Sequence, residues 1–183
     1  TIYSAEYINV ERGKSMLYAI IVALILGLVI IVFVTNNMQA QRRKEEEERR
    51  RELMKARAII DETEELVSNM AEIPFSFEAY SILYSRILQS LNNMLSLTDG
   101  NKDIKNRIEQ INDFVNTGEF PAKDSANAEI PSNEKQLIAM IQGIKKYRMI
   151  LRSEHSKKRI SSELFVSEDK KVERFQVKIN VES

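Results

Sequence analysis

The chain has 183 residues, and its 27 basic and 27 acidic side chains give a formal net charge of zero at pH 7. It contains no cysteine and a single histidine, His155, which excludes thiolate sites and histidine-rich metal sites. Its five glycines never cluster, so a glycine-rich phosphate-binding loop is absent from the sequence. We therefore expect a protein that is not an enzyme and that has no cofactor, no metal site and no catalytic residue.

The first element in chain order is an apolar segment from Met16 to Val34, without a charge, an amide or a proline. At a rise of about 1.5 Å per residue, a helix of this length spans about 29 Å, close to the hydrocarbon thickness of a bilayer. The run is longer than the apolar region of a signal peptide, and no small-x-small cleavage site follows it. The sequence predicts an uncleaved, single transmembrane helix at residues 16–34.

The basic residues that flank this segment predict its orientation. Two of them, Arg12 and Lys14, precede the segment, whereas eight follow it between residues 42 and 57. Basic flanks remain on the cytoplasmic side, and acidic residues contribute little to this bias. We expect residues 1–15 to form a short non-cytoplasmic tail and the C-terminal part to be cytoplasmic.

Three small residues share one face of the predicted membrane helix. Ala19, Ala23 and Gly27 lie four residues apart. Small residues at this spacing let two transmembrane helices approach closely, so this face is a candidate helix–helix contact in a homo-oligomer. The alternative is coincidence, because alanine is common in such helices.

Residues 35–52 predict a charged helical stalk. The stretch 41–52 contains no apolar residue, so it cannot form the seam of a coiled coil. Glu45, Glu46 and Glu47 each precede an arginine by four residues. Ion pairs in this order stabilise a solvated helix by about 0.2–0.5 kcal/mol each.

The first basic residues of the stalk are candidate contacts for anionic lipid headgroups. Arg42, Arg43 and Lys44 follow the predicted membrane helix closely. A membrane surface attracts such residues by about 1 kcal/mol per charge. The alternative interpretation, which we favour, is a topology signal followed by a solvated spacer.

Residues 53–118 predict a bundle of three helices. The first runs from Leu53 to Ile73 and ends before Pro74, because the residue before a proline is pushed out of the helical region. Its apolar residues recur at steps of three and four, with Thr63 as an interruption. The stripe consists of Leu53, Ala56, Ile60, Val67 and Met70, and Ile59, Leu66 and Ile73 widen it.

The second helix of the bundle has the most apolar face outside the membrane segment. We expect it to begin at the N-cap Ser76, with Glu78 in its first turn, and to end with Gly100 as the C′ residue. We expect it to be the centre of the bundle. Its predicted buried stripe is Leu83, Ile87, Leu91 and Met94.

The third helix is expected from about Lys102 to Val115, closed by Gly118 and antiparallel to the second. Residues 119–132 then predict a loop, with two prolines and no periodic apolar pattern. A basic amphipathic helix follows at residues 133–160. Its apolar stripe is Leu137, Met140, Ile144, Tyr147 and Leu151.

This last helix also carries a basic stripe, which we define as Lys145, Arg148, Arg152, His155 and Arg159. On an ideal helix these five positions fall within a sector of about 80°. Such a face is a candidate contact for an anionic partner, whereas the alternative is an ordinary solvated helix face. Contact with nucleic acid is disfavoured, because no aromatic interleaving and no known nucleic-acid-binding motif accompany the charges.

Residues 161–183 predict a hairpin, with a loose tail as the alternative. Phe175, Val177, Ile179 and Val181 alternate with polar residues, which is typical of a strand. A short partner strand near Leu164 would complete the pair.

Taken together, these features predict a mainly α protein and a single-pass, membrane-anchored adaptor or scaffold. Its helical bundle would present a protein-interaction surface on the cytoplasmic side, and we expect an unidentified protein partner. The alternative is a membrane-bound regulator that contacts nucleic acid or anionic lipid through the basic stripe.

Overall fold

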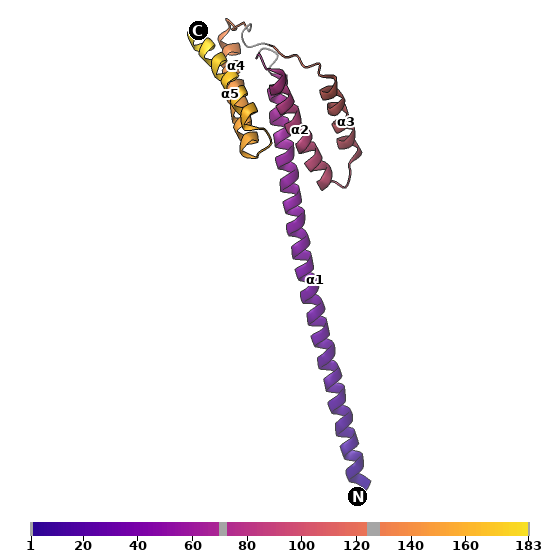
Figure 1. Ribbon diagram of the computed structural model, residues 1–183. Helices are drawn as coiled ribbons and strands as arrows, with labels where there is room; N and C mark the ends of the chain where they lie inside the picture. The colour runs from indigo at the N-terminus through magenta and orange to yellow at the C-terminus, as the bar shows by residue number, and fades with distance from the viewer. Residues whose placement is uncertain (1, 70–72, 124–128, 183) are drawn as a thin grey trace. The chain divides into compact units, whose positions relative to one another are not determined.

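The computed structural model describes the backbone of residues 2–69, 73–123 and 129–182, and side chains from residue 12 to residue 181 within these ranges. The described residues form five α-helices and no strand, which confirms the predicted mainly helical fold (Figure 1). The helices are α1 (Ile2–Ser68), α2 (Phe77–Leu97), α3 (Lys102–Thr117), α4 (Glu134–Ser156) and α5 (Ser162–Glu182). The chain divides into two units, residues 1–50 and residues 51–183.

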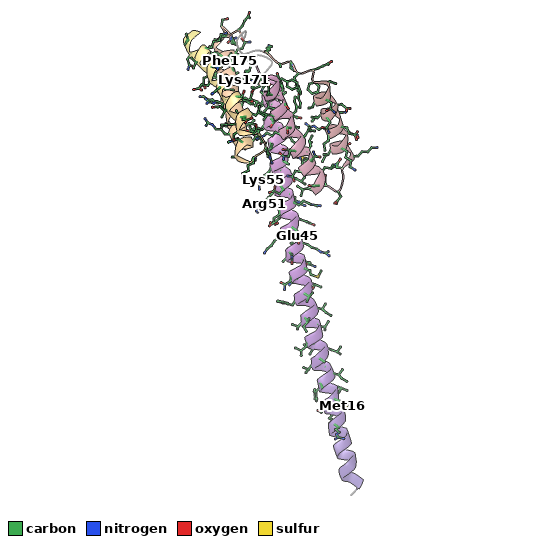
Figure 2. All side chains as sticks on the ribbon, viewed as in Figure 1. Met16, Glu45, Arg51, Lys55, Lys171 and Phe175 are labelled. Atoms are coloured by element: carbon green, nitrogen blue, oxygen red, sulfur yellow. The ribbon has the colours of Figure 1, made fainter. Side chains whose placement is uncertain are left out.

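The first unit contains the apolar segment of α1. Within the described residues, α1 is the one helix long and apolar enough to cross a membrane. The large apolar side chains from Met16 to Val34 are 43% to 68% exposed. In Figure 2, side chains project from both sides of the helix above the Met16 label. A helix that is apolar on every side needs an apolar environment on every side.

The stalk segment that follows is helical, as predicted, but the expected ion pairs do not form. In this described stretch, no ion pair joins Glu45, Glu46 or Glu47 to the arginine four residues later, and all these side chains are exposed. Lys55 and Glu52 form an ion pair at 2.7 Å just beyond. Exposed ion pairs gain little electrostatic energy in water, and their formation costs side-chain entropy. Their absence therefore changes the stability of the helix by only a few tenths of a kcal/mol.

The second unit has two groups of buried apolar residues, which we call the large core and the small core. The large core draws residues from α1, α2, α4, α5 and the α1–α2 connection. The small core comprises Ala56, Ile60, Ile87, Leu91 and Met94, from α1 and α2. Since α2 contributes to both, and Leu83, Ile87, Leu91 and Met94 are all buried, the prediction that α2 is central is confirmed.

The end of α1 differs from the sequence prediction in two respects. The helix ends at Ser68, five residues before Ile73, and the predicted stripe position Met70 lies outside the described residues. Thr63 is buried on the apolar face and does not interrupt it. Its hydroxyl donates a 2.6 Å hydrogen bond to the carbonyl of Ile59, which satisfies the polar group inside the helix.

The start of α2 matches the prediction, whereas its end does not. Ser76 is the N-cap and accepts a hydrogen bond from the backbone N–H of Ala79 at 3.1 Å. The helix ends at Leu97, and Asp99, with φ of 49°, occupies the left-handed position expected for Gly100. Aspartate tolerates this conformation better than most residues, so glycine is not required there. Gly100 follows with φ of 81°.

Helix α3 packs against α2 along the edge of the second unit (Figure 1). It begins after the N-cap Asn101 and ends at Thr117, and Gly118 closes it, as predicted, in a left-handed conformation with φ of 66°. Ile104, Ile108 and Ile111 cover the small core but remain half-buried.

The loop before α4 is partly described, because residues 124–128 lie outside the described ranges. Phe120 lies among four aromatic rings, with ring centroids 5.1 to 5.6 Å away. Helix α4 begins after the N-cap Asn133 and ends at Ser156, four residues earlier than expected. Lys158, with φ of 57°, turns the chain, so Arg159 belongs to the connection and not to the helix.

The predicted C-terminal hairpin is wrong, because residues 162–182 form helix α5, which packs against α4. Phe175 and Ile179 are buried and lie on one helical face, four residues apart. Val177 and Val181 fall on the opposite face and are 55% and 79% exposed. The apparent alternation thus combined two faces of a helix.

Candidate functional site

The structure separates the predicted basic stripe into two sets. Lys145 and Arg152 lie on the exposed side of α4. The other three, Arg148, His155 and Arg159, contact side chains of α4 and α5. The binding of an anionic partner by the whole stripe remains a prediction.

The engaged residues of the stripe face α5 and the α4–α5 connection. The guanidinium of Arg148 donates two hydrogen bonds to the carboxylate of Asp169, at 2.9 and 3.2 Å. The ring of His155 stacks on Phe165, with centroids 4.4 Å apart, and the ring of His155 lies within hydrogen-bonding distance of a serine of α5. Arg159 pairs with Glu154 at 3.3 Å. The contacts of Arg148 and His155 follow from the packing of helix α5, where the sequence had predicted a hairpin.

The exposed side of α4 combines the remaining two basic residues with two apolar ones. We call Ile138, Lys145, Met149 and Arg152 the exposed α4 face. On a helix these positions fall within a sector of about 60°. Ile138 and Met149 are 47% and 61% exposed, and within the described residues no ion pair involves Lys145 or Arg152.

The candidate sites of the first unit lie on α1. Ala19, Ala23 and Gly27 share one helical face in the apolar segment, and a Cβ added to Gly27 would meet no atom within 4 Å. Nothing in the described chain therefore requires glycine at this position. Arg42, Arg43 and Lys44 are exposed, which leaves them accessible to headgroups.

The second unit also contains a cavity of about 580 Å³ between the α1–α2 connection, α4 and α5. Its apolar lining includes Ile73, Phe75, Ile144 and Phe175, all buried members of the large core. A volume of this size falls in the usual range of small-molecule sites, about 300–1,000 Å³. Lys171 and Phe175, on the α5 side of this cavity, are labelled in Figure 2.

One buried carboxylate, that of Glu168, organises the polar side of the cavity. It accepts hydrogen bonds from the hydroxyl of Ser76 at 2.8 Å and the hydroxyl of Tyr147 at 3.1 Å. Its other oxygen accepts a 2.7 Å bond from the ammonium of Lys171. Lys171 also donates to Glu78 at 3.2 Å. The carboxylate thus joins α5 to α4 and to the N-cap of α2, and both of its oxygens are occupied.

The pKa shifts around Glu168 agree with these partners. Burial, with the charge of Glu168 as a further cause, raises the pKa of the Tyr147 hydroxyl, so it stays a donor. Burial lowers the pKa of Lys171, but its hydrogen bonds to Glu168 and Glu78 outweigh this and raise it overall. A backbone hydrogen bond at the start of α2, followed by Lys171, lowers the pKa of Glu78.

The cavity lining is otherwise basic. It includes four cationic side chains, Lys123, Lys171, Arg174 and Lys178, and Glu168 is the only acid among the lining residues that the structure describes. The negative charge of Glu168 is compensated by the positive charge of Lys171. Arg174 is exposed and forms no ion pair within the described part of the chain.

A second buried charge network lies between α1, α2 and α4. Arg86 donates to Glu154 at 3.0 Å and to Glu62 at 3.0 Å. The side chains of Arg86 and Glu154 are more than nine-tenths buried, and the Nε of Arg86 has no hydrogen-bond partner in the described structure. This network holds helices together and lies away from the cavity lining.

Sequence analysis missed Glu168, Arg86 and Glu154 as site residues. A signal was present for two of them. Arg86 lies beside Leu83 and Ile87 on the apolar face of α2. Glu168 likewise precedes Val172, Phe175 and Ile179 at helical spacing. A charged residue inside an apolar stripe predicts burial with a partner, provided that the helix is recognised.

Comparisons with known proteins assign no relative to this chain. No protein-family model matches the sequence, and neither a curated protein nor a solved structure matches it.

Proposed function

We propose that this chain is a single-pass, membrane-anchored adaptor whose residues 51–183 present a helical interaction surface on the cytoplasmic side of a membrane. The observation that carries the proposal is the exposure of every large apolar side chain from Met16 to Val34. Burying that surface in lipid removes a large apolar area from water, at about 25 cal/mol per Å².

Membrane extraction tests the anchor. Leu24→Arg combined with Val29→Arg places two charges in the middle of the segment, each costing about 2.5–3.5 kcal/mol on insertion. The unmodified chain should stay in membranes washed with alkaline carbonate, whereas the double variant should be released. Gln39→Arg, outside the apolar segment, is the matched control and should be retained. Release of the unmodified chain would contradict the anchor.

Thiol labelling tests the orientation. The chain has no cysteine, so single cysteines report without background. Lys157→Cys, at an exposed position, should react with a membrane-impermeant maleimide only after cells are permeabilised. Ala5→Cys, in the predicted non-cytoplasmic tail, should react in intact cells. The reverse pattern would overturn the orientation.

The exposed α4 face supports the adaptor part of the proposal. Ile138 and Met149 are exposed apolar side chains on this face, and methionine adapts to differently shaped partners. Lys145 and Arg152 flank Met149 and have no ion-pair partner in the described chain. We therefore propose that this face binds an acidic protein segment that also carries apolar side chains.

Site-specific photo-crosslinking in native membranes tests this surface. A photoreactive residue at Met149 should form an adduct with one protein, and Lys145→Glu with Arg152→Glu should abolish it through charge repulsion. The same photoreactive residue at Lys158, in the α4–α5 connection, is the control and should not form it. An adduct with RNA or lipid at Met149 would favour the alternative regulator, and an adduct insensitive to both charge reversals would overturn the proposed surface.

A further inference from the structure

We propose that the cavity between the α1–α2 connection, α4 and α5 is a binding site for a small amphipathic anion, an aliphatic chain that ends in a phosphate or a carboxylate. The site is separate from the exposed α4 face and does not depend on the adaptor function.

The floor of the cavity suits an aliphatic chain. Ile73, Phe75, Ile144 and Phe175 line a volume of about 580 Å³, and each of these side chains is held in place by the large core. Small-molecule sites are lined mainly by apolar and aromatic side chains and are usually formed before the ligand binds. A preformed apolar floor lowers the entropic cost of binding.

The polar side of the cavity disfavours a cationic ligand. An amine would need the carboxylate of Glu168, but Ser76 and Tyr147 occupy one of its oxygens and Lys171 occupies the other. Displacing the buried Tyr147 hydroxyl would leave it unsatisfied, at about 1–3 kcal/mol. Glu168 therefore acts as a positioning residue, which holds Lys171 at the cavity.

The cavity lining instead favours an anionic head. Arg174 lies in the lining and makes no ion pair with another described residue. Its guanidinium provides a planar set of donors that matches a phosphate or a carboxylate. Lys171 and Lys178 lie three residues before and four residues after it in α5, so all three cations share one side of the helix. An anion at Arg174 thus meets positive potential while its chain lies on the apolar floor.

The test uses the full chain in nanodiscs of phosphatidylcholine, titrated with decyl phosphate by isothermal calorimetry. Binding should saturate at one ligand per chain. Arg174→Glu should weaken it at least about tenfold, because a charged hydrogen bond is replaced by repulsion. Lys102→Glu is the control charge reversal, since Lys102 is an exposed cation of α3 that lies outside this cavity, and it should change the affinity less than about twofold.

Three further measurements test which parts of the ligand are recognised, where it binds and where it comes from. Inorganic phosphate and decanol should each bind far more weakly than decyl phosphate, and Ala122→Trp should block binding by filling the cavity while the unfolding midpoint is retained. Added vesicles that contain phosphatidic acid should compete if a membrane lipid is the source, and should not compete if the source is a free amphiphile. Absence of saturable binding, equal losses in Arg174→Glu and Lys102→Glu, or unchanged binding in Ala122→Trp would overturn the proposal.

Discussion

The guanidinium of Arg86 in α2 donates a 3.0 Å hydrogen bond to the carboxylate of Glu154 in α4, and both side chains are more than nine-tenths buried. The two residues are 68 positions apart in the chain. A buried ion pair stabilises a fold only when both charges remain paired, because the desolvation of each one is costly. The contact therefore makes the packing of α4 on α2 sensitive to the loss of either partner.

Removal of one charge should destabilise the second unit more than removal of both. Arg86→Met leaves Glu154 buried with Arg159 as its remaining cation and should lower the free energy of unfolding by about 3–5 kcal/mol. Arg86→Met combined with Glu154→Met should recover a large part of that loss. Denaturant unfolding of the full chain in detergent, followed by circular dichroism, measures both. A double variant less stable than Arg86→Met would contradict the paired burial.

Truncation of the α2 core residue Ile87 should also destabilise the second unit. Ile87 is 1% exposed and lies in the small core. Ile87→Ala should cost about 2–5 kcal/mol, because it removes buried methyl groups and leaves a cavity. The matched control is Ile138→Ala on the exposed α4 face, which should change the unfolding free energy by less than about 0.5 kcal/mol. Equal effects of the two substitutions would show that this face of α2 is not core.

Because residues 162–182 form a helix, an aspartate at Ile179 and an aspartate at Val177 should affect stability differently. Ile179→Asp introduces a charge into the large core and should destabilise the second unit by several kcal/mol. Val177→Asp lies on the exposed face and should be tolerated. In a hairpin both residues would lie on one face, since they are two positions apart. Similar melting temperatures for the two variants would therefore argue against α5.

Stability should fall at alkaline pH through Tyr147. Burial is the main cause that raises its pKa above the ordinary value of 10.0, so the folded state keeps a proton that the unfolded state loses. Its stabilising contribution is complete below about pH 10 and is lost as the pH rises beyond that value. Lys171, whose pKa is also raised, acts in the same direction above its ordinary value of 10.5.

Tyr147→Phe should reduce this alkaline loss. At neutral pH the variant should be less stable by about 1 kcal/mol, because Glu168 loses one donor. Between about pH 9 and pH 11 its free energy of unfolding should fall less steeply than that of the unmodified chain. Denaturant titrations at several pH values measure the slope, and parallel curves for the two proteins would be the contradicting result.

Self-association of the anchor remains a prediction from Ala19, Ala23 and Gly27. Gly27→Ile adds bulk where the chain itself leaves open space, so any effect on association has to come from a second helix. The substitution should weaken association of the anchor in a membrane reporter assay and leave insertion intact, because isoleucine is favourable in lipid. Ala23→Ile should act in the same way, whereas Ile30→Leu is a neutral control. Unchanged association after Gly27→Ile would exclude this face.

The features that the sequence alone determined are local ones. The apolar segment Met16–Val34, the N-cap Ser76 and the left-handed cap Gly118 all follow from residues within a few positions of one another. Capping and helical periodicity act over one or two turns, so they can be recognised without knowledge of the fold. The buried stripe of α2 belongs to this class as well.

The partners and the burial of the charged residues are set by the tertiary structure and not by the local sequence. The sequence grouped Arg148 with Arg152 in one basic stripe, but the packing of α5 pairs Arg148 with Asp169 and leaves Arg152 exposed. Glu168 reaches Ser76, 92 positions away, through the same packing. The free energy of a charge depends on its burial and on the groups around it, and both are set by segments distant in the chain. For that reason the cavity and its buried carboxylate could not be read from the sequence.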